Sequence, residues 1–177
     1  MKQKQQIFRI VLAAILLSLS YVLPFLTGQI PEIGSMLCPM HIPVILCGFL
    51  CGWKYGVIVG FIAPIIRSLT LGMPPLFPTA VCMAFELATY GFFSGLLYNI
   101  FPKKNINIYI VLLISMIMGR VVWGSAMLMA VGFDFSRFNI SVFWSGAVVS
   151  AIPGILIQLI IIPIIIMIYE KNKKIDL

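Results

Sequence analysis

Long apolar segments, separated by short polar ones, make up almost the whole of this 177-residue sequence. A helix needs about 20 consecutive apolar residues to cross the hydrocarbon core of a bilayer. With 62% hydrophobic and only 10% charged residues, the chain also has too little polar surface to cover a water-soluble globule. The sequence therefore predicts an integral membrane protein built from helices.

Six such segments can be recognised, each ended by proline, glycine or charged residues. They cover residues 7–26, 40–52, 55–71, 79–100, 106–131 and 140–169. The second is short, and the sixth contains Pro153 and Pro163, which are expected to bend it. Little of the chain lies outside these segments, so we expect one all-α domain with six transmembrane helices over residues 1–177.

The positions of lysine and arginine predict how the spans are oriented, because basic residues concentrate in cytoplasmic loops. Of the 12 basic residues, one side of the membrane would hold only Arg137, whereas Arg67 and Arg120 lie within spans. The others fall on the opposite side: Lys2, Lys4, Arg9, Lys54, Lys103, Lys104, Lys171, Lys173 and Lys174. We therefore expect both termini in the cytoplasm, a location in the cell membrane, and no nucleic-acid partner despite the net charge of +7.

Apart from Arg9 at the cytoplasmic start of the first span, the predicted spans contain four residues of the acidic, basic or histidine types: His41, Arg67, Glu86 and Arg120. At about 1.5 Å per helical residue, all four lie between the membrane centre and the outer face. Such groups are costly in a bilayer and by default mark a functional site. The excess of positive charge favours an anionic or carboxylate-bearing ligand. The alternative is that Glu86 pairs with one arginine only to hold two helices together.

Helical spacing adds neighbours to these charged groups. Tyr90 shares a face with Glu86, Trp123 and Met127 share a face with Arg120, and Trp144 comes from the sixth span. The sequence thus predicts a chamber that opens outward. Its candidate ligand-binding residues are Arg120, Glu86, Arg67, Trp123, His41, Tyr90, Met127 and Trp144. A soft metal on Cys38, Met40 and His41 is an alternative, but no second histidine or carboxylate is close in sequence. We expect no metal and no cofactor.

Motifs of catalysis are missing from the sequence. One histidine cannot provide an HExxH metal site, and neither GxSxG nor a Walker phosphate loop is present. The chain is therefore not expected to be an enzyme, and ATP hydrolysis would have to come from a partner subunit.

Small residues recur at intervals of four, a spacing that lets helices approach closely. Gly52, Gly56 and Gly60 form one series, and Gly91 and Gly95 form another. Ala14 and Ser18 repeat the spacing on the first span, where the face they share is a candidate for docking a partner protein.

Two long stretches and one short one resemble a known family, the substrate-binding S components of energy-coupling factor (ECF) vitamin transporters. HIPVILCGFLCGWKYGVIVGFIAPIIRSL, residues 41–69, resembles the second and third helices of that family, and FPTAVCMAFELATYGFFSGLLY, residues 77–98, resembles the fourth. AILLS, residues 14–18, is similar to the AxxxA face that meets the coupling subunit, with Ser18 in place of the second alanine. The resemblance covers almost the whole chain.

The resemblance implies a substrate-binding subunit that works with a transmembrane coupling subunit and two ATPase subunits. It also implies a ligand in the outer half of the membrane, among helices 4 to 6. Pantothenate, folate, biotin, riboflavin and queuosine precursors are ligands of the family. The two intramembrane arginines and Trp123 favour a carboxylate such as pantothenate. The alternatives are a non-transporting six-span scaffold of the cell-shape kind and an autonomous ion-coupled carrier, although the spans show no clear inverted repeat.

Overall fold

The computed structural model describes residues 2–27, 36–134, 140–144 and 151–175, and helices make up most of them, with no strand among the described residues. In chain order the elements are α1 (Lys2–Val22), η1 (Leu23–Thr27), α3 (His41–Cys51), α4 (Trp53–Leu71), η2 (Leu76–Ala80), α5 (Val81–Ile100), α6 (Asn105–Ala130), α7 (Ile140–Trp144) and α8 (Ile152–Ile175). The predicted all-helical fold is confirmed.

Within the described residues, five helices are long and apolar enough to cross a membrane. The predicted second span corresponds to α3, which has only 11 residues. A helix of that length reaches about half of the hydrocarbon thickness. The chain is therefore membrane-embedded with five candidate spans, and the sixth span stays a prediction.

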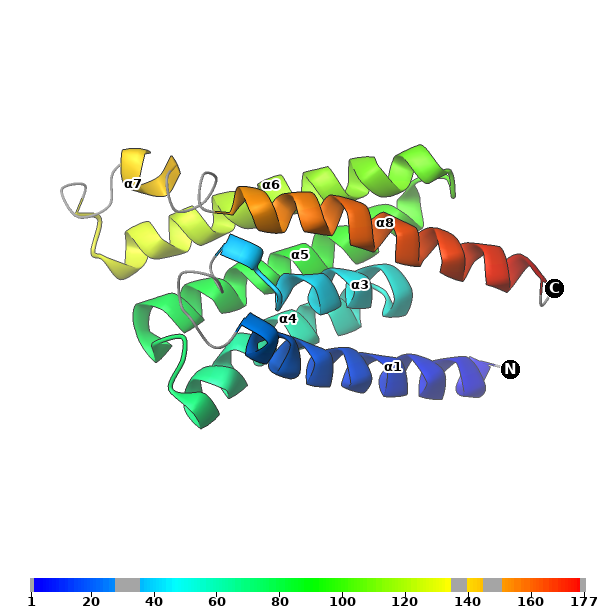
Figure 1. Ribbon diagram of the computed structural model, residues 1–177, viewed down its shortest axis with the longest axis horizontal. Helices are drawn as coiled ribbons and strands as arrows, with labels where there is room; N and C mark the ends of the chain where they lie inside the picture. Colours follow the sequence, from blue (N-terminus) through cyan, green and yellow to red (C-terminus); the bar gives the residue numbers. More distant parts are fainter. Residues whose placement is uncertain (1, 28–35, 135–139, 145–150, 176–177) are drawn as a thin grey trace.

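The long helices run back and forth along the longest axis of the molecule (Figure 1). Both ends of the chain lie at one end of the bundle, which we call the termini end. The connection between α5 and α6 also lies there, whereas η2 and α7 lie at the opposite end. Placing both termini on one side is what the sequence predicted, and the cytoplasmic assignment of that side stays a prediction.

The sixth predicted span differs from the structure. One helix was expected from residue 140, but the structure has a short α7 and a separate α8 that begins at Ile152. Pro153 is the second residue of α8 and therefore lies in its first turn. A proline has no N–H to donate, and the first turn of a helix needs none. Pro153 thus marks the beginning of a helix and not a bend within one, whereas Pro163 does lie inside α8.

Glycines bring α3, α4 and α5 into backbone contact, and we call these three helices the glycine-packed layer. A Cβ atom on Gly56 of α4 would lie 2.6 Å from the carbonyl oxygen of Gly91 on α5, and one on Gly48 of α3 would lie 2.7 Å from the same oxygen. Gly60 meets the backbone of Leu87 in the same way. The close helix packing predicted from the glycine spacing is confirmed.

Gly52 serves a different purpose from the packing glycines. It is the single residue between α3 and α4, and its φ of 99° lies in a region that residues with a side chain rarely adopt. Nothing lies within 4 Å of the position that its Cβ would take. Its role is therefore to let the chain reverse between two helices.

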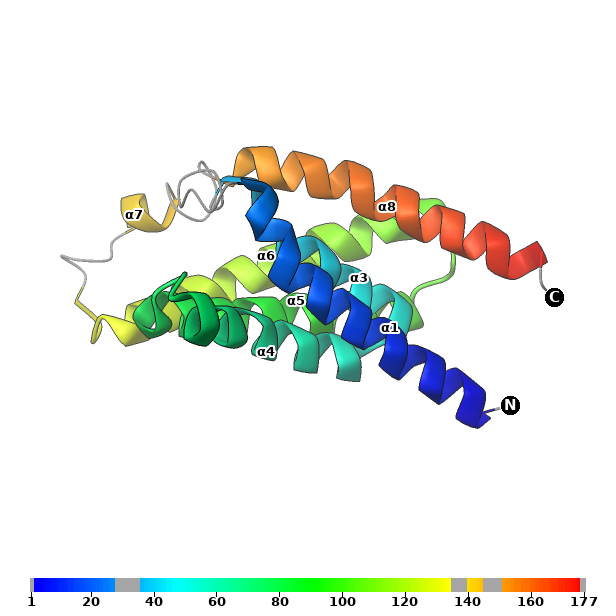
Figure 2. The same cartoon turned by 60° about the horizontal axis from the view of Figure 1, so that its bottom comes forward.

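The remaining long helices flank the glycine-packed layer. α1 crosses obliquely over α3 and α4 (Figure 2), α6 packs on α5, and α8 packs on α3 and α6. The buried core between them is apolar and includes Val44, Ile45, Leu87, Leu112 and Ile162. Large apolar side chains also cover the outward faces, as expected where lipid replaces water.

Candidate functional site

Glu86 on α5 is the centre of a buried polar cluster. Its Oε1 atom lies 2.9 Å from Nη1 of Arg120, accepts a hydrogen bond from the Tyr90 hydroxyl at 3.1 Å, and lies 3.6 Å from Nε2 of His41. Glu86 is only 1% exposed. Four of the predicted site residues, from α3, α5 and α6, therefore meet at one carboxylate oxygen. We call His41, Glu86, Tyr90 and Arg120 the Glu86 cluster.

Local structure explains how these side chains come together. Tyr90 follows Glu86 by four residues and so lies on the same face of α5. Gly119 lets α6 approach the Tyr90 ring, because a Cβ there would lie 2.5 Å from Cε1 of Tyr90. The residue after Gly119 is Arg120, which is thereby brought to Glu86. The ring of His41, at the start of α3, packs edge-on against Tyr90 at 5.3 Å.

Within the Glu86 cluster, the buried negative charge of Glu86 requires the positive charge of Arg120. A carboxylate this deeply buried is tolerated only beside a positive group, and Arg120 supplies it. The second terminal nitrogen of Arg120, Nη2, contacts the Cys38 sulfur at 3.7 Å, and a thiol is a weak acceptor. The Arg120 side chain is 16% accessible, compared with 2% for Glu86. Arg120 is therefore the more accessible member of the ion pair.

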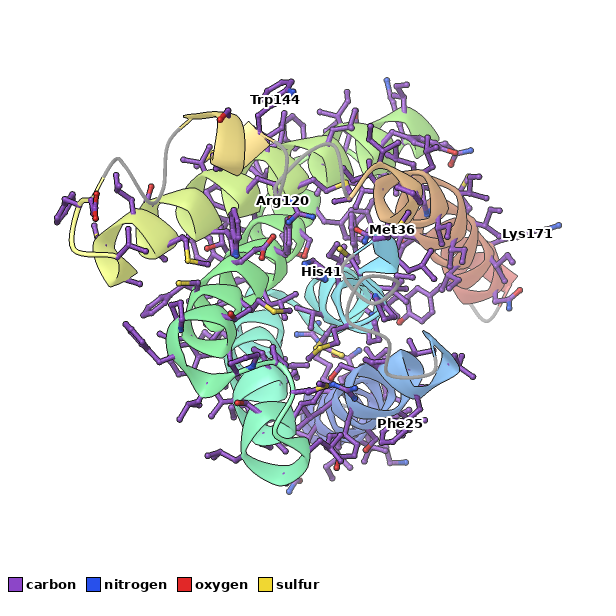
Figure 3. All side chains as sticks on the ribbon, turned by 60° about the vertical axis from the view of Figure 1, so that its left-hand side comes forward. Phe25, Met36, His41, Arg120, Trp144 and Lys171 are labelled. Carbon is purple, nitrogen blue, oxygen red and sulfur yellow. The ribbon has the colours of Figure 1, made fainter. Side chains whose placement is uncertain are left out.

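Figure 3 brings forward the end of the bundle opposite the termini. His41 and Arg120 are labelled close together in the interior between the helices, whereas Trp144 lies at the periphery and Phe25 lies on the α1 side. The Glu86 cluster thus occupies the space between α3, α5 and α6.

The predicted aromatic wall is only partly assembled beside the Glu86 cluster. The ring of Trp123, on α6 one turn beyond Arg120, lies 6.3 Å from the ring of Phe143 on α7. Met127 follows one turn later and is half-buried. Trp144 was predicted to join the same chamber, but its side chain is 61% exposed and points away (Figure 3). The short α7 presents Phe143, and not Trp144, to α6.

A family model described as the substrate-specific component of ECF transporters matches residues 8–166. The chain belongs to this family. Comparisons with curated proteins and with solved structures gave no match. Members of the family, the S components, are membrane proteins that bind substrate and are not ATPases themselves. They associate with a transmembrane and ATPase module, and the resemblance found in the sequence is confirmed.

Arg67 of this S component lies outside the Glu86 cluster, although the sequence predicted it in the same chamber. Its Nη1 atom donates a hydrogen bond to the carbonyl oxygen of Tyr21 at 2.9 Å, and its guanidinium lies 5.3 Å from the Phe25 ring. The face of α4 that carries Arg67 is turned toward α1, because the glycine face of α4 is occupied by α5. Arg67 therefore joins α4 to the end of α1.

Replacing Arg67 with glutamine is expected to spare ligand binding. The change removes a charge-assisted hydrogen bond to Tyr21, which contributes about 1.5–3 kcal/mol to stability. We expect a lower midpoint of thermal unfolding in detergent and an unchanged dissociation constant for the ligand. Arg120→Gln is the matched comparison, since it replaces the arginine of the Glu86 cluster. A folded Arg67→Gln protein that no longer binds ligand would return Arg67 to the ligand site.

The predicted docking residues Ala14 and Ser18 lie on an exposed face of α1. The Ser18 hydroxyl donates to the carbonyl oxygen of Ala14 at 3.0 Å, so its polar atom is satisfied within the helix. Ser18 also borders an open groove of about 250 Å³ between α1 and α4. The groove is otherwise apolar, with Leu17, Tyr21, Val22, Ala63 and Ile66 as its lining. The exposed face of α1 that carries Ala14 and Ser18 therefore consists of small side chains and borders a largely apolar groove.

From the sequence, Cys38 is a candidate only as an alternative metal ligand with Met40 and His41, and Gly119 has no predicted part in the polar site. Cys38 is 82 residues from Arg120 in the chain, and no local pattern reveals their contact. Gly119 directly precedes Arg120, and a glycine beside an intramembrane charge is a signal of close helix approach that was available in the sequence.

Proposed function

We propose that this S component is the high-affinity substrate-binding subunit of an ECF-type ABC importer for a vitamin or related micronutrient. It works in the bacterial plasma membrane, as a single domain, with a transmembrane coupling subunit and two ATPase subunits. The family assignment supports this over a cell-shape scaffold. The observation that carries the proposal is the Glu86 cluster, a buried polar group at the end of α5 that lies away from the termini.

We further propose that the substrate carries a carboxylate, with pantothenate as the first candidate. Arg120 already neutralises Glu86 through Nη1, but its Nη2 contacts only a weak sulfur acceptor in the described structure. A ligand carboxylate would be a far stronger partner for the same donors. Because Arg67 lies against α1, the excess of positive charge inferred from the sequence does not gather at this site. The support for a carboxylate comes instead from the N–H groups of Arg120.

The test is to identify the small molecule that co-purifies with the detergent-solubilised protein by mass spectrometry. The protein is then titrated with a vitamin panel that includes pantothenate and panthenol, in which an alcohol replaces the carboxylate. A retained carboxylate, and binding of pantothenate but not panthenol, is the expected result. A retained ligand without a carboxylate would refute the substrate class, and a protein that binds no member of the panel would refute vitamin binding.

Leucine at Ala14 or at Ser18 is expected to block uptake and leave ligand binding intact. Bulk on a face of small residues keeps a partner helix at a distance, while the Glu86 cluster lies on other helices. Uptake is measured in cells that also express the coupling module, and binding is measured on the purified chain. Ser125→Leu, at an exposed small residue of α6, is the control for added bulk. Normal uptake by both α1 variants would remove this face from the docking surface.

A further inference from the structure

The imidazole of His41 is buried without a hydrogen bond. The residue is 3% exposed, and neither Nδ1 nor Nε2 has a hydrogen-bond partner within the part of the chain that the structure describes. Nε2 lies 3.6 Å from Oε1 of Glu86, which is too long for a hydrogen bond but places a charged group opposite it. Nδ1 has no hydrogen-bond partner among the described residues. Buried polar atoms in proteins almost always have a partner, so an unpartnered Nδ1 beside a candidate substrate site requires an explanation.

Within the described residues, the polar groups known to lie near His41 have other partners. The Tyr90 hydroxyl donates to Glu86, and the two terminal nitrogens of Arg120 are directed to Glu86 and to Cys38. The backbone N–H of His41 itself is used by the carbonyl oxygen of Cys38, at 3.1 Å. The Tyr90 hydroxyl and the backbone N–H of His41 are therefore engaged, and Nη2 of Arg120 is directed at the Cys38 sulfur.

The position of Glu86 also fixes the chemical character of Nδ1. A carboxylate oxygen only accepts hydrogen bonds, so we assign the ring proton to Nε2, the nitrogen that faces Oε1 of Glu86 at 3.6 Å. In the neutral imidazole the other nitrogen, Nδ1, is then an acceptor. Its missing partner is a donor, an N–H or an O–H group.

We propose that Nδ1 of His41 accepts a hydrogen bond from the bound substrate. This inference rests on the proposed function and narrows its substrate class. Arg120 holds the carboxylate, and His41 requires a hydroxyl or amide N–H on the same molecule. Arg120 and His41 both approach Oε1 of Glu86, so both residues border the same part of the site. The substrate is a hydroxy or amido acid, and a simple fatty or aromatic acid is rejected.

Two amide substitutions separate the two nitrogens of the ring. The side-chain amide of asparagine reaches the place of Nδ1, whereas that of glutamine reaches the place of Nε2. His41→Asn therefore keeps an acceptor for the substrate, and His41→Gln keeps a donor toward Glu86. His41→Phe keeps only the ring that packs against Tyr90.

The probes are pantothenate and biotin, two acids with N–H donors, titrated into each purified variant in detergent. We expect His41→Asn to bind within a few-fold of the unchanged protein. His41→Gln and His41→Phe should bind on the order of tenfold more weakly, the effect of one lost neutral hydrogen bond. Without ligand, thermal unfolding should rank the variants in the other order, with His41→Gln more stable than His41→Asn. A purely structural histidine would give the same order in both measurements.

Equal binding by His41→Asn and His41→Gln, or stronger binding by His41→Gln, overturns the inference and leaves the proposed function standing. If the unchanged protein binds neither acid but binds a vitamin of the panel that lacks a carboxylate, the inference falls together with the carboxylate proposal. If a simple acid without an N–H or O–H donor binds as tightly as the better of the two probes, the role of Nδ1 is also refuted.

Discussion

Glutamine in place of Arg120 is expected to destabilise the S component by about 3–5 kcal/mol, because it leaves Glu86 buried without a counter-charge. Glu86→Gln should be milder. It leaves the guanidinium of Arg120 without its carboxylate, and the Arg120 side chain is 16% accessible, whereas that of Glu86 is 2% accessible. The double variant Glu86→Gln/Arg120→Gln removes both charges and should recover most of the lost stability. Thermal unfolding in detergent, without ligand, measures all three.

The double variant also separates the structural use of the ion pair from its use in binding. If Arg120 holds the substrate, the double variant folds but its affinity for a carboxylate ligand falls at least a hundredfold, the effect of losing a charge-assisted contact of about 3 kcal/mol. Affinity is measured by titration calorimetry, with Arg67→Gln as the control for loss of an arginine. Retained affinity in the folded double variant would show that the pair only joins α5 to α6.

Valine at Gly91 is expected to prevent correct packing of the glycine-packed layer. Gly91 and Gly56 meet backbone to backbone, and the added side chain would overlap the carbonyl group of Gly56. Backbone atoms cannot move aside as the end of a flexible side chain can. The loss of stability should therefore reach or exceed about 3 kcal/mol, the upper range for overpacked cores. Yield and thermal unfolding in detergent are the measurements.

Ser125→Val is the matched control for Gly91→Val, because it adds a β-branched side chain at an exposed position of α6. We expect its unfolding midpoint to stay close to that of the unchanged protein. If Gly91→Val unfolds at the same temperature as the control, the helices are not as close at this point as the structure places them.

Features set within one helix could be predicted from the sequence. The apolar segments predicted the long helices, the glycine spacing predicted helix faces that can be approached closely, and the interval of four placed Tyr90 on the same face as Glu86. Each depends on the regular geometry of a helix, which the sequence displays directly.

Features set by the rotation of one helix against another could not be predicted in this way. Arg67 and Arg120 were equal candidates to meet Glu86, and depth in the membrane did not separate them. The choice depends on Gly119, which brings α6 against Tyr90, and on the glycine face of α4, which turns Arg67 toward α1. The contact of Arg120 with Cys38, across 82 residues, is of the same kind. The place of Trp144 and the start of α8 depended on where a new helix begins, and Pro153 in the first turn of α8 could equally have been read as a bend within one helix.

The two faces of α5 carry different constraints. One face meets α3 and α4 through glycine backbone, so almost any larger residue there would push helices apart. The other face carries Glu86 and Tyr90, whose side chains reach α3 and α6. If the Glu86 cluster binds the substrate as proposed, exchanging residues on this second face together with their partners would change the chemistry presented to a ligand. The glycine contacts that hold α5 in place would stay the same.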